Sequence, residues 1–377
     1  MPRLEFETLD KLKNHLAQST ELTGAVFQSL DLTKMESELA TATLRENVLL
    51  GCNFNDAVLR HFDRPLIFPQ LPDLPFNPYR SLLYSPEELL GGYQIGDVDS
   101  YRNTIDGASY HHYIENRGAA SMDAYVTLAR RLHDHAMTDA LQEYIADKKV
   151  VAIMGGHSVS RDEPVYLKIA RLAKKLVHAG FLPTSGGGPG LMEATHLGAW
   201  FAERSDDDLV DAVKILSKAP LYDPIGPWLD TAFTVAEKYP VKNRENCQSL
   251  GIPTWLYGHE PPSCFALHIA KYFANSVREE GLLAIAAYGV IFAPGSAGTI
   301  QEIFQDAAQN HYKTFGHASP MIFLDEEYWT VKKPTYPLLV KLAEGHDYGQ
   351  LLSITDSGET ALEQVISFAG ILDSDQA

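Results

Sequence analysis

The sequence predicts an α/β fold: a Rossmann-like, doubly wound and mainly parallel sheet, preceded by an N-terminal extension or small domain of mixed structure. Two observations support this prediction. Apolar runs typical of buried strands recur near residues 150, 182, 253, 290, 321 and 352, with helix-like segments between them. Two of these runs pass through a glycine-rich turn directly into a helix, at 181–200 and 289–308.

Composition limits the functions open to the chain. Its 377 residues allow two domains, and 45% hydrophobic residues can supply sizeable cores. Acidic residues outnumber basic ones, 49 to 31, which argues against a nucleic acid or a membrane surface as a partner. No signal peptide is visible, and no apolar run approaches the ~18–20 residues of a membrane span, so a cytoplasmic protein is expected. The three cysteines have no metal-like spacing.

Residues 1–147 are predicted to form an N-terminal domain of unassigned role. Segments 27–32 and 44–54 faintly resemble pentapeptide-type repeats, but two copies are too few for a solenoid. Residues 63–104 are rich in proline and tyrosine, which is typical of ordered, irregular chain. A long helix is expected over 121–146, capped by Ser121, with His133 and Asp134 on a solvated face.

Residues 148–377 are predicted to form the α/β domain, because strand-like and helix-like segments alternate throughout. The first strand, helix and second strand should make a right-handed crossover. The long insertion at 204–260 is typical of a lid or specificity loop. Strands are predicted at 150–153, 181–185, 251–257, 289–293, 320–324 and 351–355, with a turn at 258–262, and helices at 164–179, 191–200, 206–216, 263–280, 299–308, 336–343 and 356–370.

The glycine turns are the candidate binding elements. A strand, a tight turn and a helix start direct backbone N–H groups and the positive end of the helix dipole at one point, where a phosphate can bind. Alternatively, each is a plain turn that binds nothing. Glu302 lies one turn inside the later helix. The candidate binding residues of these two turns are Gly186, Gly187, Gly188, Gly190, Met192 and Glu193 in the earlier one, and Gly295, Ser296, Gly298 and Thr299 in the later one.

Both turns also carry a family resemblance. Ser185-Gly-Gly-Gly-Pro-Gly-Leu-Met-Glu-Ala194, followed by Pro294-Gly-Ser-Ala-Gly-Thr-Ile-Gln-Glu302, resembles the LOG family of nucleoside 5′-monophosphate phosphoribohydrolases, whose members are often labelled lysine decarboxylases. The family's second motif is Pro-Gly-Gly-x-Gly-Thr-x-x-Glu, so this chain departs from it at Ser296. The resemblance covers 148–370 and leaves out the N-terminal region.

The resemblance implies an N-glycosidase-type hydrolase that converts a nucleotide into free base and ribose 5-phosphate. Glu302 would be catalytic, because a carboxylate can stabilise an oxocarbenium-like ribose or activate water. Arg278 would assist it, although it lies 16 residues before Pro294, one more than in typical members. The first turn, with Gly155, Gly156 and Ser158, would also face the nucleotide. A homodimer or larger homo-oligomer without cofactor or metal is expected.

The sequence leaves two points open. The base could be a common purine or pyrimidine, or the isoprenoid-modified adenine of a cytokinin. The protein could instead be a non-catalytic nucleotide or molybdenum-cofactor binding protein of the same fold, because Ser296 and the displaced Arg278 depart from the enzyme pattern. Retention of Glu302 favours the enzyme. Amino-acid decarboxylation is disfavoured, since nothing resembles a pyridoxal-phosphate lysine site.

Overall fold

The computed structural model describes residues 3–256, 260–316 and 318–375. The chain divides into two compact units, each discontinuous in sequence. The first unit contains Met1–Leu83 and Glu115–Glu143, and the second contains Tyr84–Ile114 and Tyr144–Ala377. Residues 84–114 therefore belong to the α/β unit, although they precede the long helix at which the sequence placed the domain boundary.

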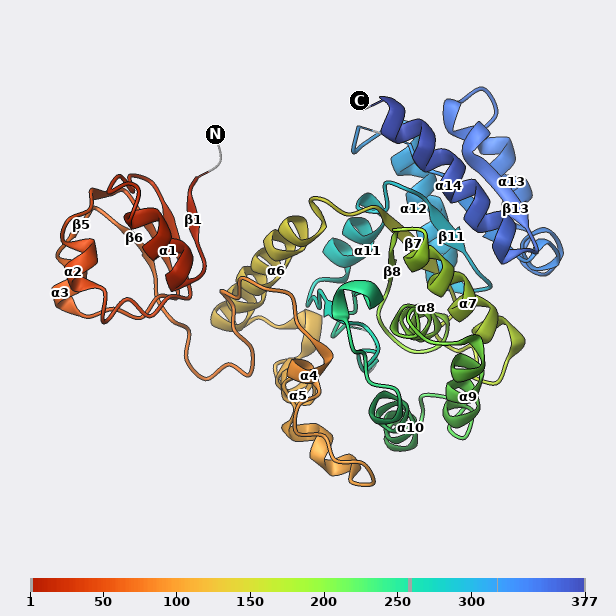
Figure 1. The fold of residues 1–377 in the computed structure, drawn as a ribbon, viewed down its shortest axis with the longest axis horizontal. Coiled ribbons are helices and arrows are strands. Elements are labelled where there is room, and N and C mark those ends of the chain that lie inside the picture. Colours follow the sequence, from red (N-terminus) through yellow and green to blue (C-terminus); the bar gives the residue numbers. More distant parts are fainter. Residues whose placement is uncertain (1–2, 257–259, 317, 376–377) are drawn as a thin grey trace. The chain divides into compact units, whose positions relative to one another are not determined.

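The second unit is built on a seven-stranded parallel sheet (Figure 1). Its spatial order is β10-β9-β8-β7-β11-β12-β13, so the strand order reverses between β7 and β11. This is the topological switch point at which open α/β sheets bind ligands. The predicted Rossmann-like class is confirmed. The strands are β7 (Val150–Met154), β8 (Leu182–Ser185), β9 (Leu250–Gly251), β10 (His268–Ile269), β11 (Val290–Phe292), β12 (Met321–Leu324) and β13 (Leu352–Thr355).

Helices alternate with these strands, and most begin and end close to the predicted residues. The insertion at 204–260 contains two helices, α9 and α10, so it is not only an open loop. Ser205 caps α9 in a reciprocal capping box with Asp208. The helices of this unit are α4 (Pro86–Leu89), α5 (Ile105–Glu115), α7 (Pro164–His178), α8 (Leu191–Trp200), α9 (Asp206–Leu216), α10 (Ile225–Lys238), α11 (Asn275–Ala284), α12 (Ala297–Tyr312), α13 (Thr335–Leu342) and α14 (Gly358–Asp375), with shorter turns at Val98–Asn103, Arg244–Cys247, Tyr328–Lys332 and Asp347–Leu351.

The segment 251–280 differs from its prediction. The expected strand 251–257 is only the two-residue β9 plus an isolated bridge from Thr254 to Tyr272, and Tyr257 and part of the expected turn 258–262 lie outside the described residues. The expected helix 263–280 begins only at Asn275. Residues 261–275 are almost all buried, so their apolar side chains do not mark one face of an amphipathic helix.

Residues 84–114 are attached to the sheet by buried polar contacts. Tyr84 forms an antiparallel bridge with Ile269 in β10, with backbone N···O distances of 2.9 and 2.8 Å. Asp106, fully buried at the start of α5, accepts hydrogen bonds from the Trp255 indole at 2.9 Å and from the Lys271 ammonium, which is also fully buried. An unpaired buried charge is costly, so Asp106 and Lys271 each require the other.

The first unit is a stack of short parallel strands over a leucine- and phenylalanine-rich core. Phe27 pairs with Leu49, so the two repeat-like segments lie in register on neighbouring strands. β1 and β6 extend this stack on either side, and β6 pairs Ile67 with Leu49 of β4. The elements are β1 (Glu5–Phe6), α1 (Leu9–Leu16), β2 (Val26–Gln28), α2 (Glu36–Leu39), β3 (Leu44–Arg45), β4 (Val48–Leu50), α3 (Asp56–Leu59), β5 (Phe62–Asp63) and β6 (Leu66–Phe68).

The long helix predicted over 121–146 is α6 (Ala124–Ile145). Its N-terminus is capped by the carboxylate of Asp123, which accepts the N–H groups of residues 125 and 126, rather than by Ser121. His133 and Asp134 are buried, not solvated, and burial lowers the pKa of His133. Within the described ranges, no helix combines the length and apolar character that a bilayer crossing requires.

Candidate functional site

A cavity of about 200 Å³ lies where β7 and β11 end and α12 begins, at the switch point of the sheet. It brings together eight residues proposed from the sequence: Gly155, Gly156, Met192, Arg278, Ser296, Gly298, Thr299 and Glu302. Five others that the sequence did not assign complete its lining: His157, Thr254, Glu260, Glu279 and Ala297. Seven proposed residues are not part of the lining: Ser158, Gly186, Gly187, Gly188, Gly190, Glu193 and Gly295.

The start of α12 has the features of an anion site. Ser296 is its N-cap residue, yet the serine hydroxyl accepts no hydrogen bond from the helix N–H groups. Ile300 donates its N–H to the Ser296 carbonyl at 2.9 Å, so the intrahelical bonds begin only there. Ser296, Ala297 and Gly298 are exposed, and a Cβ on Gly298 would meet no atom within 4 Å. The first N–H groups of α12 can therefore be reached by a ligand.

The glycines of the other two turns serve close backbone packing. Gly156 donates its N–H to the Pro294 carbonyl at 2.9 Å, which joins the first turn to the α12 turn. Gly190 has φ +68°, and a Cβ there would collide with the carbonyls of Gly156 and His157. A Cβ on Gly187 would lie 2.8 Å from Pro253. Neighbouring protein atoms thus fill the space that a side chain would need at these positions of the triple-glycine turn.

Glu302 and Arg278 form the polar centre of the cavity. Their closest charged atoms, Glu302 Oε1 and Arg278 Nη1, are 3.7 Å apart, and the Glu302 side chain is 13% exposed. Arg278 is oriented by the Ile252 carbonyl, to which its Nε donates at 2.7 Å. Burial raises the pKa of Glu302 to about 7, Arg278 opposes this, and Glu279 and Glu260 add to it. A carboxyl that titrates near neutrality is suited to acid–base work.

Two further glutamates surround this pair. The Gln301 amide donates to Glu279 at 2.6 Å, which fixes that carboxylate beside Arg278. Burial raises the pKa of Glu260, while His157 and Arg278 partly offset the rise. Neither glutamate belongs to a glycine motif. The position of Glu279 next to Arg278 was a usable signal, whereas nothing in the sequence around Glu260 marks it.

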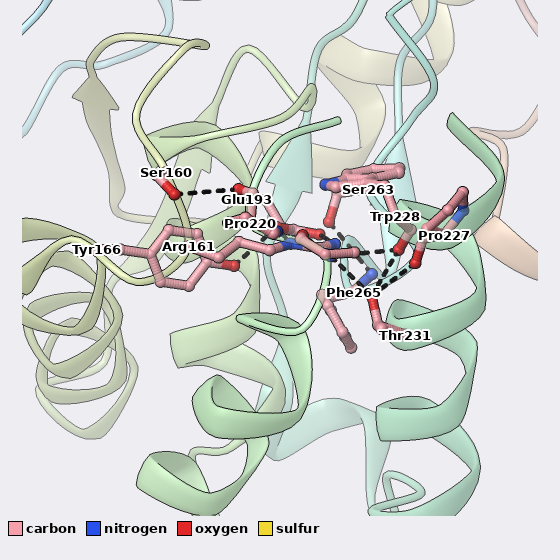
Figure 2. Close-up of polar contacts among 11 residues, drawn as sticks. Ser160, Arg161, Tyr166, Glu193, Pro220, Pro227, Trp228, Thr231, Ser263 and Phe265 are labelled. Atoms are coloured by element: carbon pink, nitrogen blue, oxygen red, sulfur yellow. Dashed lines mark hydrogen bonds and ion pairs between the residues drawn. The ribbon is translucent and has the colours of Figure 1, made fainter. Parts of the chain in front are cut away.

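Glu193 has a different environment from the one expected (Figure 2). It is fully buried, and its two carboxylate oxygens accept bonds from Arg161 at 2.7 and 2.5 Å and from the Tyr166 hydroxyl at 2.7 Å. Arg161 also donates to the Trp228 carbonyl and to the Thr231 hydroxyl of α10. Because its oxygens are occupied by these groups, Glu193 ties α8 to the insertion, and the expected contact with a ribose or base is withdrawn.

A metal centre is not evident in the chain as described. Among residues 3–256, 260–316 and 318–375, no group of three or more His, Cys, Asp or Glu side chains is arranged to hold a metal ion. Cys52, Cys247 and Cys264 are free and buried. The polar groups available to a ligand at the cavity are therefore carboxylates, one guanidinium, the His157 imidazole, hydroxyls and the backbone N–H groups of α12.

No family model and no curated protein matches this sequence. The structure is similar to the molybdenum cofactor binding protein of the phototrophic bacterium Rippkaea orientalis, with 16% identity over 59% of this chain and 98% of that one and a TM-score of 0.38. It is also similar to the Moco carrier protein of Chlamydomonas reinhardtii, with 14% identity, coverage of 59% and 98%, and a TM-score of 0.36.

Proposed function

We propose that the protein is a nucleoside 5′-monophosphate phosphoribohydrolase. The observation that carries the proposal is a titratable glutamate that shares one cavity with an exposed helix N-terminus. Glu302, with a pKa of about 7, lies one helical turn from the exposed N-terminus of α12 and shares a cavity with Arg278. In a nucleoside 5′-monophosphate the phosphate and the reactive C1′ carbon are attached to the same ribose. The phosphate can therefore bind at the α12 N-terminus while C1′ lies near Glu302, one helical turn away.

In the proposed reaction the 5′-phosphate binds at residues 296–299, and the ribose lies toward Glu302. The bond between C1′ and the base nitrogen breaks, and its electron pair leaves with the base, which takes up a proton from solvent; Glu302 returns the proton it gains to solvent after the reaction. The ionised Glu302 stabilises the positive charge that develops on the ribose and accepts a proton from water as the water oxygen bonds to C1′. Arg278 holds the carboxylate in place and contacts phosphate or ribose oxygens. No metal or cofactor takes part.

The test is direct. The purified full chain, without added metal or cofactor, should release free base and ribose 5-phosphate from at least one of AMP, GMP, CMP, UMP and isopentenyladenosine monophosphate, followed by chromatography. The Glu302→Gln variant is the matched control for contaminating nucleosidases. Absence of base release from the whole panel would contradict the hydrolase.

The second candidate is a non-catalytic protein that binds a nucleotide or the molybdenum cofactor. The departures at Ser296 and in the spacing of Arg278 favour it, because both positions differ from the pattern of the hydrolases that the chain resembles. A Cβ on Gly188 would lie 3.0 Å from Met192 and 3.2 Å from Glu260, so these side chains already cover the triple-glycine turn. If the purified protein binds a nucleotide but releases no base from it, the non-catalytic binding protein is the correct candidate.

Assembly and location complete the proposal. We expect a homodimer or a larger homo-oligomer that acts in the cytoplasm on a small-molecule substrate. Light scattering at micromolar concentration measures the first point directly, and a mass of 41.8 kDa, that of one chain, would contradict it.

A further inference from the structure

We propose that Lys333 is a phosphate-binding cation of this site and that Ser296 positions it, so that the site selects phosphorylated over unphosphorylated ribosides. This inference rests on the proposed function, because it concerns the same cavity. Lys333 belongs to no glycine motif and lies 37 residues from Ser296 in the sequence, yet its Nζ donates to the Ser296 hydroxyl at 2.7 Å. A lysine is thereby held at the exposed start of α12.

The position of this ammonium favours a bound anion, because its described partners, the Ser296 hydroxyl and the Tyr328 ring at 6.0 Å from the ring centroid, carry no negative charge. The N-terminus of a helix carries partial positive charge, so a nearby cation is repelled and a nearby anion is attracted. Among the described residues, no carboxylate forms an ion pair with Lys333, whereas its neighbour Lys332 pairs with Glu327 at 3.5 Å. The cavity also contains three glutamates, and Arg278 is the only Lys or Arg in its described lining. A phosphate here would gain from Lys333 and from the helix together.

The backbone that carries Lys333 is fixed to the same turn. The Tyr328 hydroxyl donates to the Gly295 carbonyl at 2.6 Å. The fully buried Trp329 donates its indole N–H to the Phe292 and Leu324 carbonyls, at 3.1 Å each, and so joins the ends of β11 and β12. The π-helical turn Tyr328–Lys332 therefore brings the Lys333 backbone to a defined position beside the α12 turn, and the hydrogen bond to Ser296 directs its ammonium there.

Serine is chemically suited to this positioning role. Its oxygen accepts the Lys333 hydrogen bond without neutralising the positive charge, as an aspartate would, and its own hydroxyl hydrogen remains free to donate to a phosphate oxygen. Glycine, which the resembled family carries at this point of the motif, can do neither. Ser296, where the resembled family has glycine, and Lys333 thus act together. They add a hydroxyl and a cation to the backbone N–H groups of the anion site.

The experiment uses the full chain and ribose 5-phosphate, the part shared by all candidate nucleotides, with binding measured by titration calorimetry. Lys333→Met should raise the Kd about tenfold, the loss expected for one charge-assisted hydrogen bond. Lys332→Met is the matched control and should leave the Kd unchanged. The difference between these two variants should shrink as salt is added, because the interaction is electrostatic. Ser296→Ala should weaken binding, and Ser296→Thr, which restores a hydroxyl, should recover it.

Three outcomes would overturn the inference: equal Kd values for the two lysine variants, a loss that salt does not change, or no binding of ribose 5-phosphate by the wild-type protein at millimolar concentration. Failure of the proposed function is a separate result. If ribose 5-phosphate binding depends on Lys333 but no nucleotide releases base, the phosphate site stands and the hydrolase does not. If base is released and kcat/KM for nucleotides is the same in both lysine variants, only the inference about Lys333 falls.

Discussion

The junctions β8–α8 and β11–α12 have the same order of strand, glycine turn, helix and glutamate, but their environments are opposite. All ten residues of α8 are buried, and Glu193, its third residue, is bonded on both oxygens. At the start of α12, residues 296–298 are exposed, and Glu302 has one cation at 3.7 Å. The first junction is an element of the core, and the second is open to a ligand.

This contrast shows what a glycine turn does and does not predict. Glycine permits the close approach of another group to the backbone. At Gly190 that group is protein, the carbonyls of Gly156 and His157. At Gly298 no atom lies within 4 Å of the Cβ position, so a ligand can take that place. The motif indicates that a close approach occurs, and the tertiary packing determines what approaches.

The largest expected difference is between the two glutamates. Glu302→Gln should lower kcat by about 10²–10⁴ with little change in ligand binding, because only the transition state requires the negative charge. Glu193→Gln should instead destabilise the fold by about 3–5 kcal/mol, because it leaves the Arg161 guanidinium buried without its charged partner.

Steady-state kinetics and urea unfolding of both variants measure this contrast. Near wild-type turnover in the Glu302→Gln variant would show that Glu302 is not catalytic and serves only as a residue of the helix. A fully stable Glu193→Gln variant would show that the buried pair is not required by the fold.

Next in size is the effect of pH on Glu302. Burial raises its pKa to about 7, so the carboxyl is protonated at lower pH and gains its charge as pH rises through that value. If the ionised form is the active one, kcat/KM should rise about 100-fold between about pH 5 and pH 8, close to tenfold per unit at the lower end. The second ionisation of the substrate phosphate lies near 6. The step near 7 should vanish in Glu302→Gln while any step near 6 remains.

The same shift has a consequence for stability, with the opposite sign. The folded protein holds the Glu302 proton more tightly than the unfolded chain, whose pKa is near 4.5. The stabilisation from this group is therefore complete below about pH 4.5 and is lost as pH rises through about 7. Glu302→Gln should become more stable than the wild type as pH increases over this window, and equal urea midpoints at all pH values would contradict the shift.

The smallest expected effects come from the glycines. Gly190→Ala places a side chain at φ +68° against two carbonyls and should cost at least about 1–3 kcal/mol of stability. Gly298→Ala fills open space at the start of a helix and should leave stability unchanged or slightly higher. It should weaken ribose 5-phosphate binding, because the methyl group occupies the ligand's side of the turn. Thermal melts measure the stability of the two variants, and calorimetry measures their binding of ribose 5-phosphate. Equal losses of stability in Gly190→Ala and Gly298→Ala would contradict the difference between the two turns.

Much of the α/β unit could be predicted from local pattern. Val150–Met154 and Met321–Leu324 are short apolar strands in the centre of a sheet, and Asp206–Leu216 has both a capping box and an amphipathic period. These signals lie within a few residues of the element they specify. The glycine turn before α12 and the place of Glu302 one turn inside that helix were predicted from spacing, whereas the exposure of the helix N-terminus depends on tertiary packing.

The failures occur where distant residues decide the outcome. His133 and Asp134 have the composition of a solvated face but are buried, and Glu193 has the position of a ligand contact but is bonded to Arg161, 32 residues away. Residues 261–275 are buried on nearly all sides, so helical spacing of their apolar groups carries no information. Lys333 could not be assigned to the site because its contact with Ser296 depends on how β12 leads into the following turn.

The buried pairing of Asp106 with Lys271 also has a consequence for the order of events during synthesis. Asp106 precedes Lys271 by 165 residues, so at about 5–20 residues per second it is synthesised roughly 8–33 seconds before its partner. Until then the contacts of residues 84–114 with Lys271 cannot form, while the chain that follows them completes the first unit. The nascent protein is thus expected to depend on chaperones at this segment, more than at any stretch that folds with its sequence neighbours.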